Sequence, residues 1–301
     1  MPSALTAAIA GVMDRHGIRD GVHVTPVPGL RLVRTHSKVA PRLMTYRASL
    51  CVICQGAKEV LAGDRTITYG HMQSLVVTID IPVLAQIVDA SEDAPYVSAT
   101  LELNPEILLE VATELGDGDS SDRETGSAMA VKDVDSQISG LMIRLVALAD
   151  QPEAIDILYP GIMREISFWL LSGPTGAEVA RTVLPTGQPG RIVQAIRHLR
   201  ENFEETIHMP DLARAAGMSL SSFHQHFKAL TAMSPLQYQK HLRLLEARRR
   251  MLTDEEKVGP AALSVGYESI SHFTRDYARM FGSPPRKAVE KIKADRLGAA
   301  A

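Results

Sequence analysis

Two copies of one local pattern constrain the fold of this 301-residue chain more than any other feature of its sequence. In the first copy, a helical pattern ends at Gly217 and another begins at Ser219, with Phe223 and Phe227 one turn apart. Glycine adopts the left-handed conformation that ends a helix, and serine is a good N-cap for the helix that follows. Ala213, four residues before the glycine, is small enough to let the two helices cross closely. The pattern predicts a helix-turn-helix unit, in which the second helix enters the major groove of DNA.

A second copy of this pattern lies further along the chain. The five positions recur in the same order as Ala262, Gly266, Ser269, Phe273 and Tyr277. The two glycines are 49 residues apart and the two serine caps are 50 residues apart, so the second turn is one residue longer. The sequence therefore predicts two helix-turn-helix units.

The segment between the two copies reads as a spacer helix. Residues 235–252 follow a serine and begin with proline, a typical helix start, and their apolar side chains recur at helical spacing. A helix of 18 residues is about 27 Å long at about 1.5 Å per residue, and one turn of B-DNA is ~34 Å. Such a spacer would hold two recognition helices in successive major grooves. An all-helical bundle with incidental Gly-Ser turns is the weaker interpretation.

The charge is divided between two parts of the chain. Residues 186–301 hold 18 Lys and Arg against 12 Asp and Glu, whereas residues 1–185 hold 14 against 23. The basic part is the candidate for contact with a polyanion. The apolar run at the N-terminus has no basic residues before it, and no stretch is long enough for a membrane span. With two cysteines in the chain, we expect a cytoplasmic protein without a disulfide scaffold.

The acidic part predicts a β-rich domain followed by helices. Short segments between residues 24 and 102 are rich in Val, Ile, Thr and Tyr and are separated by turns, which favours a sandwich or small barrel. Helices are expected from Asn104 onward and over 133–148 and 152–171, with a mobile polar loop over 116–127. The expected domains are 1–172 and 191–293, joined by a linker over 173–190 that is rich in proline and glycine.

Both parts resemble the AraC/XylS transcription regulators. The C-terminal resemblance covers residues 191–293 and rests on "DLARAAGMSLSSFHQHFK", "SPLQYQKHLRLLEARRRML" and "VGYESISHFTRDYARMFGSPP". The N-terminal one rests on "TPVPGLRLVR", "SLCVICQGAKEVLAGD" and "DAPYVSATLEL". The resemblance implies an α+β protein: a cupin-like β-barrel with dimerisation helices, then an all-α domain with two helix-turn-helix motifs. It also implies a bacterial regulator that binds operator or promoter DNA, usually an activator that contacts RNA polymerase.

The same resemblance implies which side chains face DNA bases. They are Ser221, Ser222, His224, Gln225, Ile270, Ser271, His272, Thr274 and Arg275. Arginine can hold guanine O6 and N7, glutamine can pair with adenine, and isoleucine can touch a thymine methyl group. The family often has arginine where Gln225 stands, which puts the base read by the first motif in doubt. Gly259 and Pro260 stand where the family continues a helix, and proline is tolerated only in a first turn.

An effector site is expected inside the β-rich domain. The candidate residues are Tyr46, Cys51, Gln55 and Tyr69. They suit a small, largely apolar molecule with one or two polar groups, and an aldehyde is one candidate. Cys51 and Cys54 are three apart in a strand, so they point to opposite faces and are predicted to be free buried thiols rather than a metal site. Lys58 is expected at a hairpin edge.

These patterns favour an effector-responsive regulator that forms a homodimer, with no catalytic residues, metal or cofactor. The helices over 133–148 and 152–171 are the predicted dimer surface, through Ile162, Ile166, Trp169 and Leu170. Two alternatives stay open: a cupin-type enzyme with an appended helical DNA-binding domain, and a DNA-binding architectural protein without an effector. The barrel segment has no His-x-His pair, which disfavours an iron enzyme.

Overall fold

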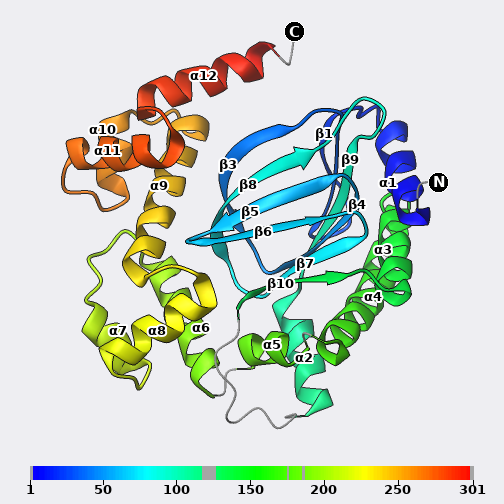
Figure 1. Ribbon diagram of the computed structural model, residues 1–301, viewed down its shortest axis with the longest axis horizontal. Helices are drawn as coiled ribbons and strands as arrows, with labels where there is room; N and C mark the ends of the chain where they lie inside the picture. The colour runs from blue at the N-terminus through cyan, green and yellow to red at the C-terminus, as the bar shows by residue number, and fades with distance from the viewer. Residues whose placement is uncertain (1–2, 117–126, 175, 185–186, 299–301) are drawn as a thin grey trace.

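The computed structural model describes residues 3–116, 127–174, 176–184 and 187–298. A β-rich domain with helices on one side is followed by a helical domain that lies against its other side (Figure 1). The α+β architecture is therefore as predicted. Most of the loop expected over 116–127 lies outside the described residues.

The strands form two antiparallel sheets. One sheet has the order β1–β2–β9–β4–β7–β10, with β1 Gly21–Val24, β2 Leu30–Thr35, β9 Tyr96–Glu102, β4 Ser49–Gln55, β7 Gln73–Val77 and β10 Met129–Asp133. The other has the order β3–β8–β5–β6, with β3 Val39–Tyr46, β8 Ile81–Asp89, β5 Ala57–Ala62 and β6 Arg65–Gly70. No hydrogen-bonded ladder joins the two sheets within the described ranges, so the β-rich domain is built of open sheets and not of a closed barrel.

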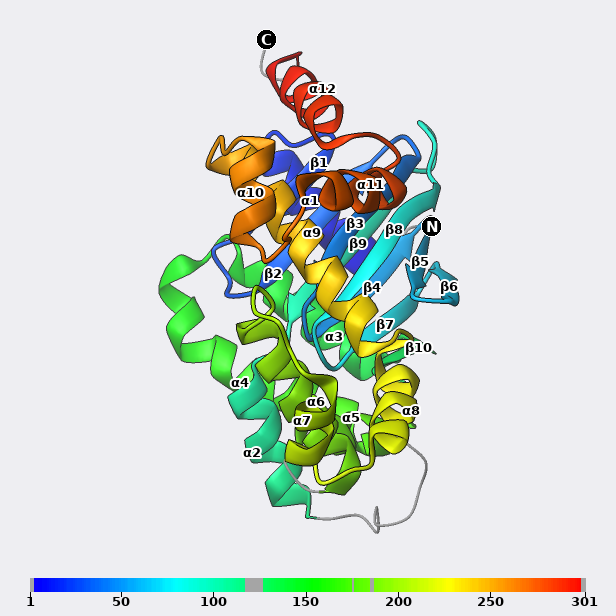
Figure 2. The ribbon, with the colours of Figure 1, turned by 90° about the vertical axis from the view of Figure 1, so that its left-hand side faces the viewer.

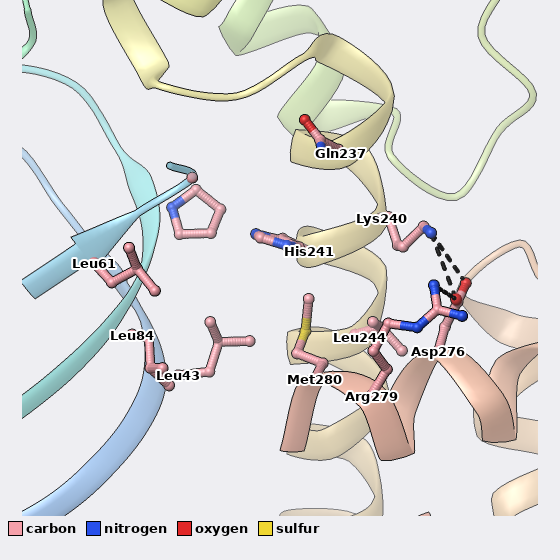
Figure 3. A pocket seen from close by; sticks show the side chains of 12 residues that line it. Leu43, Leu61, Leu84, Gln237, Lys240, His241, Leu244, Asp276, Arg279 and Met280 are labelled. Carbon is pink, nitrogen blue, oxygen red and sulfur yellow. Dashed lines mark hydrogen bonds and ion pairs between the residues drawn. The ribbon is translucent and has the colours of Figure 1, made fainter. Parts of the chain in front are cut away.

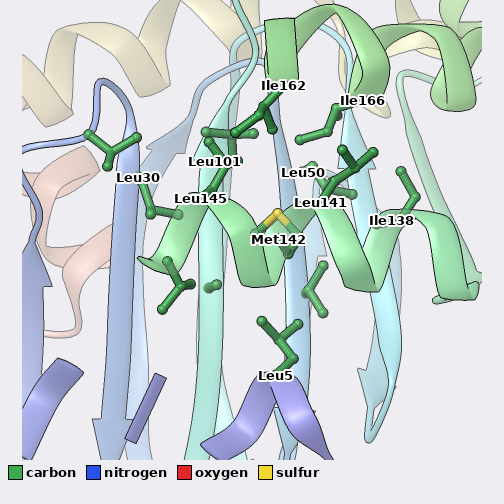
Figure 4. Packing of buried hydrophobic residues seen from close by; sticks show 14 of the residues in the cluster. Leu5, Leu30, Leu50, Leu101, Ile138, Leu141, Met142, Leu145, Ile162 and Ile166 are labelled. Atoms are coloured by element: carbon green, nitrogen blue, oxygen red, sulfur yellow. The ribbon is translucent and has the colours of Figure 1, made fainter. Parts of the chain in front are cut away.

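Alternation along β4 explains how the domain is layered. Leu50, Val52 and Cys54 face a core shared with helices, whereas Cys51 and Ile53 face the opposite sheet. The helix-side core packs α1 (Ala4–Arg15), α3 (Ser136–Leu148) and α4 (Pro152–Ser172) against the six-stranded sheet (Figure 4). The predicted opposite orientation of the two cysteines, both free and buried, is confirmed.

Three further helices belong to the first domain or to the segment that joins it to the C-terminal part. They are α2 (Pro105–Leu115), α5 (Gly176–Val183) and α6 (Gly187–Glu201). Asn104 caps α2 by accepting hydrogen bonds from the backbone N–H groups of Glu106 and Ile107. The segment expected to be a linker is thus partly helical, since α5 and the first turns of α6 lie within it. The exact domain boundaries stay a prediction.

Six further helices follow in the part of the chain that the structure describes. They are α7 (Met209–Ala215), α8 (Leu220–Thr231), α9 (Pro235–Thr253), α10 (Val258–Ser264), α11 (Ile270–Phe281) and α12 (Pro285–Gly298). The long helix α9 crosses in front of the four-stranded sheet, with α7 and α8 near one of its ends and α10 and α11 near the other (Figure 2). We call α7–α8 the first unit and α10–α11 the second unit.

Candidate nucleic-acid interface

The first unit has the predicted turn. Gly217 has a φ of +67°, and the Ser219 hydroxyl accepts a 3.2 Å hydrogen bond from the backbone N–H of Ser222. Phe223 and Phe227 are fully buried. The left-handed glycine and the serine cap stop one helix and start the next within a few residues, as the sequence predicts.

The second unit repeats this geometry. Gly266 has a φ of +86°, and the Ser269 hydroxyl accepts a 3.3 Å hydrogen bond from the backbone N–H of His272. Phe273 and Tyr277 are buried like their counterparts in the first unit. Helix α10 begins at Val258, so its proline falls in the first turn, where the missing N–H breaks no helical hydrogen bond.

The predicted base-facing residues lie on the solvent side of α8 and α11. Ser221, Gln225, Ile270, Ser271, His272 and Arg275 are exposed, and Ser222, His224 and Thr274 are half-buried. No described residue forms an ion pair with Arg275, so its guanidinium is free for a ligand. The Thr274 hydroxyl instead donates to the Ile270 carbonyl, and the His272 ring lies 3.5 Å from the Asp276 carboxylate.

Helix α9 fixes the two units to each other through groups that the sequence reasoning missed. The Arg243 guanidinium donates to four carbonyl oxygens, those of Phe203, Glu204, Glu205 and Gly266, at 2.6–3.1 Å. One side chain thus ties the loop before α7 to the turn of the second unit. Burial lowers the pKa of Arg243 below its ordinary value, yet an arginine stays charged at neutral pH. Its position on the inner face of α9 was the only available signal in the sequence.

The first unit and the neighbouring ends of α6 and α9 are fastened to the sheets by polar contacts. The Tyr238 hydroxyl at the start of α9 donates to the Asp80 carbonyl at 2.6 Å, and Arg200 pairs with the Asp80 carboxylate at 2.8 Å. Lys228, at the end of α8, pairs with Asp64 at 2.9 Å in the β5–β6 turn. The backbone N–H of Ala128 also donates to the Leu230 carbonyl at 3.2 Å. We call this contact region the first seam.

A cavity lies between the second unit and the four-stranded sheet. It has a volume of about 320 Å³ and lies between the outer face of β3, β5 and β8 and the helices α9 and α11 (Figure 3). The sheet wall of the cavity is formed by Leu43, Leu61 and Leu84. From the helices, His241 and Met280 point into the cavity. We call this region the second seam.

The predicted effector residues lie mainly in the interior between the two sheets. Tyr69 and Cys51 are buried there, and Tyr46 lies partly buried against the same core. Gln55 lies half-buried at the end of β4, next to a shift in register. The sequence reasoning missed Tyr96, which is buried in the same core. The four candidates are therefore close in the fold, with Gln55 at the periphery.

Lys58 is not at a hairpin edge, as the sequence led us to expect. It pairs across the ladder with Tyr69, so both side chains lie on the inner face, and its ammonium lies 5.0 Å from the centre of the Tyr46 ring. Burial alone would lower its pKa, but Tyr46 and Cys51 offset this and hold the pKa above the ordinary value. The inner face therefore carries a positive charge. Lys58, Val60 and Ala62 are two residues apart along one strand, so their side chains lie on the same face, and this spacing was the sequence signal that Lys58 faces inward.

This interior is rich in hydrogen-bond donors. The hydroxyl groups of Tyr46, Tyr69 and Tyr96 are buried and make no close hydrogen bond among the described residues, although the side chains of Lys58, Cys51 and Ser98 lie near enough to affect their respective pKa values. Burial raises the pKa of all three hydroxyls, so they stay protonated and able to donate. Burial also raises the pKa of the Cys54 thiol, to about 12, and that thiol faces the helix-side core. Cys54 is therefore not a reactive group of this interior.

Two other kinds of site are not found in the parts of the chain that the structure describes. No three His, Cys, Asp or Glu residues lie together in a way that could hold a metal ion. No helix there combines the length and the apolar character needed to cross a membrane.

Two helix-turn-helix units carried on one helix and attached to a β-rich domain define a DNA-binding regulator with a separate regulatory domain. A model of the AraC-type transcriptional regulator N-terminus matches residues 26–178, and a helix-turn-helix domain model matches residues 212–291. The chain belongs to the AraC-type transcriptional regulators.

The relatives support this assignment over different lengths. The HTH-type transcriptional activator RhaS of Yersinia pestis bv. Antiqua (strain Angola) is 31% identical over 106 residues, which are 35% of this chain and 39% of that protein. The chain thus matches well under half of that relative. A structure of wild-type ToxT from Vibrio cholerae strain SCE256 with a bound unsaturated fatty acid has a TM-score of 0.56 at 10% identity, over 86% of this chain and 94% of ToxT. That likeness concerns the fold.

Proposed function

We propose that this regulator reads operator DNA with α8 and α11 in successive major grooves and activates transcription by contacting RNA polymerase. The observation that carries the proposal is the pairing of two exposed recognition helices at the two ends of α9. With 19 residues, α9 is about 28 Å long at about 1.5 Å per residue, close to the ~34 Å of one DNA turn. Arg275 offers an unpaired guanidinium to a guanine edge, and Gln225 offers an amide to an adenine.

We further propose that the interior between the sheets binds a small effector. Buried donors without partners cost free energy, and a ligand with acceptor oxygens would satisfy them. Lys58 adds a positive charge to the three tyrosine hydroxyls, so the interior is better supplied with donors than with acceptors. An aldehyde or a carboxylic acid has the acceptor oxygens that such an interior lacks, and ToxT was crystallised with a fatty acid.

A homodimer through α4 is the third element of the proposal, with a changed set of contact residues. Of the residues that we expected at a dimer surface, Ile162, Ile166 and Leu170 are buried in the helix-side core, and Trp169 packs against that core partly buried. The exposed apolar side chains of α4 are instead Ile157, Leu158 and Phe168, at 78%, 45% and 40% exposure. An isologous contact would bury this row against its copy. Sedimentation of the full chain tests it: Ile157→Glu should turn a dimer into a monomer, and a monomeric wild type would contradict the proposal.

DNA reading is tested by selecting a preferred sequence from random duplexes with the full-length protein. Arg275→Ala should then weaken binding to the selected site by about 1–3 kcal/mol and relax the preference at one base pair. Arg249→Ala is the control, because Arg249 is already paired with Glu246 and Asp254 and should not change which base is preferred. An unchanged base preference in Arg275→Ala would show that α11 does not read DNA as proposed.

A further inference from the structure

The cavity of the second seam has walls of two different kinds. The sheet side is aliphatic, formed by Leu43, Leu61 and Leu84, whereas the helix side adds the His241 ring (Figure 3). Its volume of about 320 Å³ is at the lower end of the range for small-molecule sites, which is about 300–1,000 Å³. Apolar walls with one or a few placed polar groups are typical of such sites.

His241 is a polar lining group whose ring makes no hydrogen bond within the described part of the chain. Its Nδ1 atom is enclosed by protein, whereas Nε2 is not, and the ring points into the cavity (Figure 3). Burial and the neighbouring Lys240 lower the pKa of this imidazole to about 4, so the ring is neutral near pH 7. Neutral imidazole carries a proton on either ring nitrogen, so Nε2 is a donor in one tautomer and an acceptor in the other. A hydroxyl group can serve both tautomers, because it donates and accepts.

The charged groups at this site are already paired with each other. The Asp276 carboxylate is buried and lies 3.4 Å from the Lys240 ammonium and 3.8 Å from the Arg279 guanidinium. A ligand carboxylate would have to compete with Asp276 for these cations, and a ligand ammonium would have to compete with the cations for Asp276. The site therefore favours a neutral ligand.

We propose that this cavity binds a small neutral molecule with an apolar body and one hydroxyl group, which hydrogen-bonds to His241 Nε2. This site is separate from the interior between the sheets, since it lies on the outer face of the four-stranded sheet. The ligand touches the sheet and the second recognition helix α11 at once, so it binds best when the second unit is docked. By linkage, a bound ligand therefore holds the second unit against the sheet. The effect of the ligand on DNA binding rests on the proposed reading of DNA by α11.

Binding is tested without DNA, so that its failure is distinct from a failure of DNA reading. The probes share one ring: cyclohexanol, cyclohexanecarboxylate and cyclohexylammonium. The full-length protein carries ¹³C-methyl methionine, and Met280→Leu identifies the signal of Met280, whose side chain lies in the cavity (Figure 3). Cyclohexanol should shift the Met280 methyl signal in a saturable way, at least tenfold more tightly than either charged analogue. An unmoved Met280 signal, or a charged probe that binds as tightly, overturns the proposal.

Two variants assign the site. His241→Leu removes the unpartnered nitrogen but keeps an apolar side chain, so the fold should persist and cyclohexanol should bind at least tenfold more weakly. Leu84→Trp should fill the cavity from the sheet side and abolish the shift of Met280. The matched control is Leu115→Phe at the exposed end of α2, which should bind within twofold of the wild type. Wild-type affinity in both His241→Leu and Leu84→Trp would overturn the assignment.

Discussion

The first helix-turn-helix unit meets the sheets through hydrogen bonds and opposite charges, whereas the second meets them across a cavity. At the first seam, Asp64 pairs with Lys228 and the Asp80 carboxylate pairs with Arg200. The Asp80 carbonyl accepts a hydrogen bond from the Tyr238 hydroxyl. At the second seam, burial is the main cause that lowers the pKa of Arg248 in α9, and the positive charge of Arg42 in β3 is a smaller one. Like charges and empty space mark a weaker contact than paired charges and hydrogen bonds.

The hydrophobic cores also indicate that the first unit is attached to the β-rich domain more firmly than the second unit. Phe223 and Phe227 of the first unit, together with Tyr238 at the start of α9, belong to one continuous cluster with the interior between the sheets. Phe273 and Tyr277 of the second unit belong to a separate cluster to which the sheets contribute no residue among those described. A separate core can move as a body without opening the β-rich domain, so we expect the second unit to be the more mobile of the two.

The largest expected effect comes from opening the first seam at the β5–β6 turn. Gly63 has a φ of +58°, and a Cβ placed there would overlap the carbonyl oxygen of Ala232. Gly17 has a similar φ of +65° but open space around it. Both Gly63→Ala and Gly17→Ala should lose about 1–2 kcal/mol of stability to left-handed strain. Gly63→Ala must in addition displace the first unit.

Thermal unfolding and hydrogen exchange measure this difference. The unfolding temperature of Gly63→Ala should fall at least twice as far as that of Gly17→Ala, and exchange should increase at Ala128, whose N–H donates across the first seam. Equal losses in the two variants would mean that the close approach at Gly63 does not hold the first unit, and the contrast between the seams would be wrong.

A smaller effect distinguishes two tyrosine hydroxyls, one at the first seam and one in the second unit. The Tyr238 hydroxyl donates to Asp80 across the first seam, whereas the Tyr277 hydroxyl is buried in the second unit without a partner in the described chain. Tyr238→Phe should therefore cost about 0.5–1.5 kcal/mol of unfolding free energy. Tyr277→Phe should cost nothing or be slightly stabilising, because it removes an unsatisfied polar group. Urea unfolding of both variants checks the pair.

The Tyr238→Phe and Tyr277→Phe variants also test whether the second unit is less well hydrogen-bonded than the first seam. If Tyr277→Phe lost as much as Tyr238→Phe, the Tyr277 hydroxyl would have a partner such as a bound water, and the second unit would be better satisfied than its contacts indicate.

The two recognition helices were predictable because their signals are local. A left-handed glycine, a serine cap and two aromatic residues one turn apart act within a few residues, and Gly217 and Gly266 have the predicted conformation. The base-facing residues on α8 and α11 were named from the resemblance and remain predictions. The exposure of most of them is consistent with contact to DNA.

The seams were not predictable because they depend on contacts between residues far apart in sequence. Tyr238 and Asp80 are 158 residues apart, and nothing near either residue indicates the other. Strand β10 was missed for a similar reason: five residues after a polar loop carry little pattern, and their pairing with β7 defines them. Helix α6 was masked by Pro189 and Gly190, which read as linker material, although proline is tolerated in a first helical turn.

The smallest expected effect concerns the exposed ion pair of the first seam. The Lys228 hydrogen bond and charge lower the pKa of Asp64 below its ordinary value. A lowered pKa in the folded state means that the pair stabilises the fold above the unfolded pKa, and that this contribution is lost as the pH falls below about 4. Lys228→Ala should return the pKa of Asp64 to its ordinary value, measured by NMR titration of its carboxyl carbon, and 1 M salt should reduce the shift in the wild type. Arg214→Ala, which breaks the Asp211 pair on the solvent side of α7, is the control and should leave Asp64 unchanged. If Asp64 titrates alike in the wild type and in Lys228→Ala, this ion pair does not form in solution, and the first seam depends on Asp80 and the backbone contacts alone.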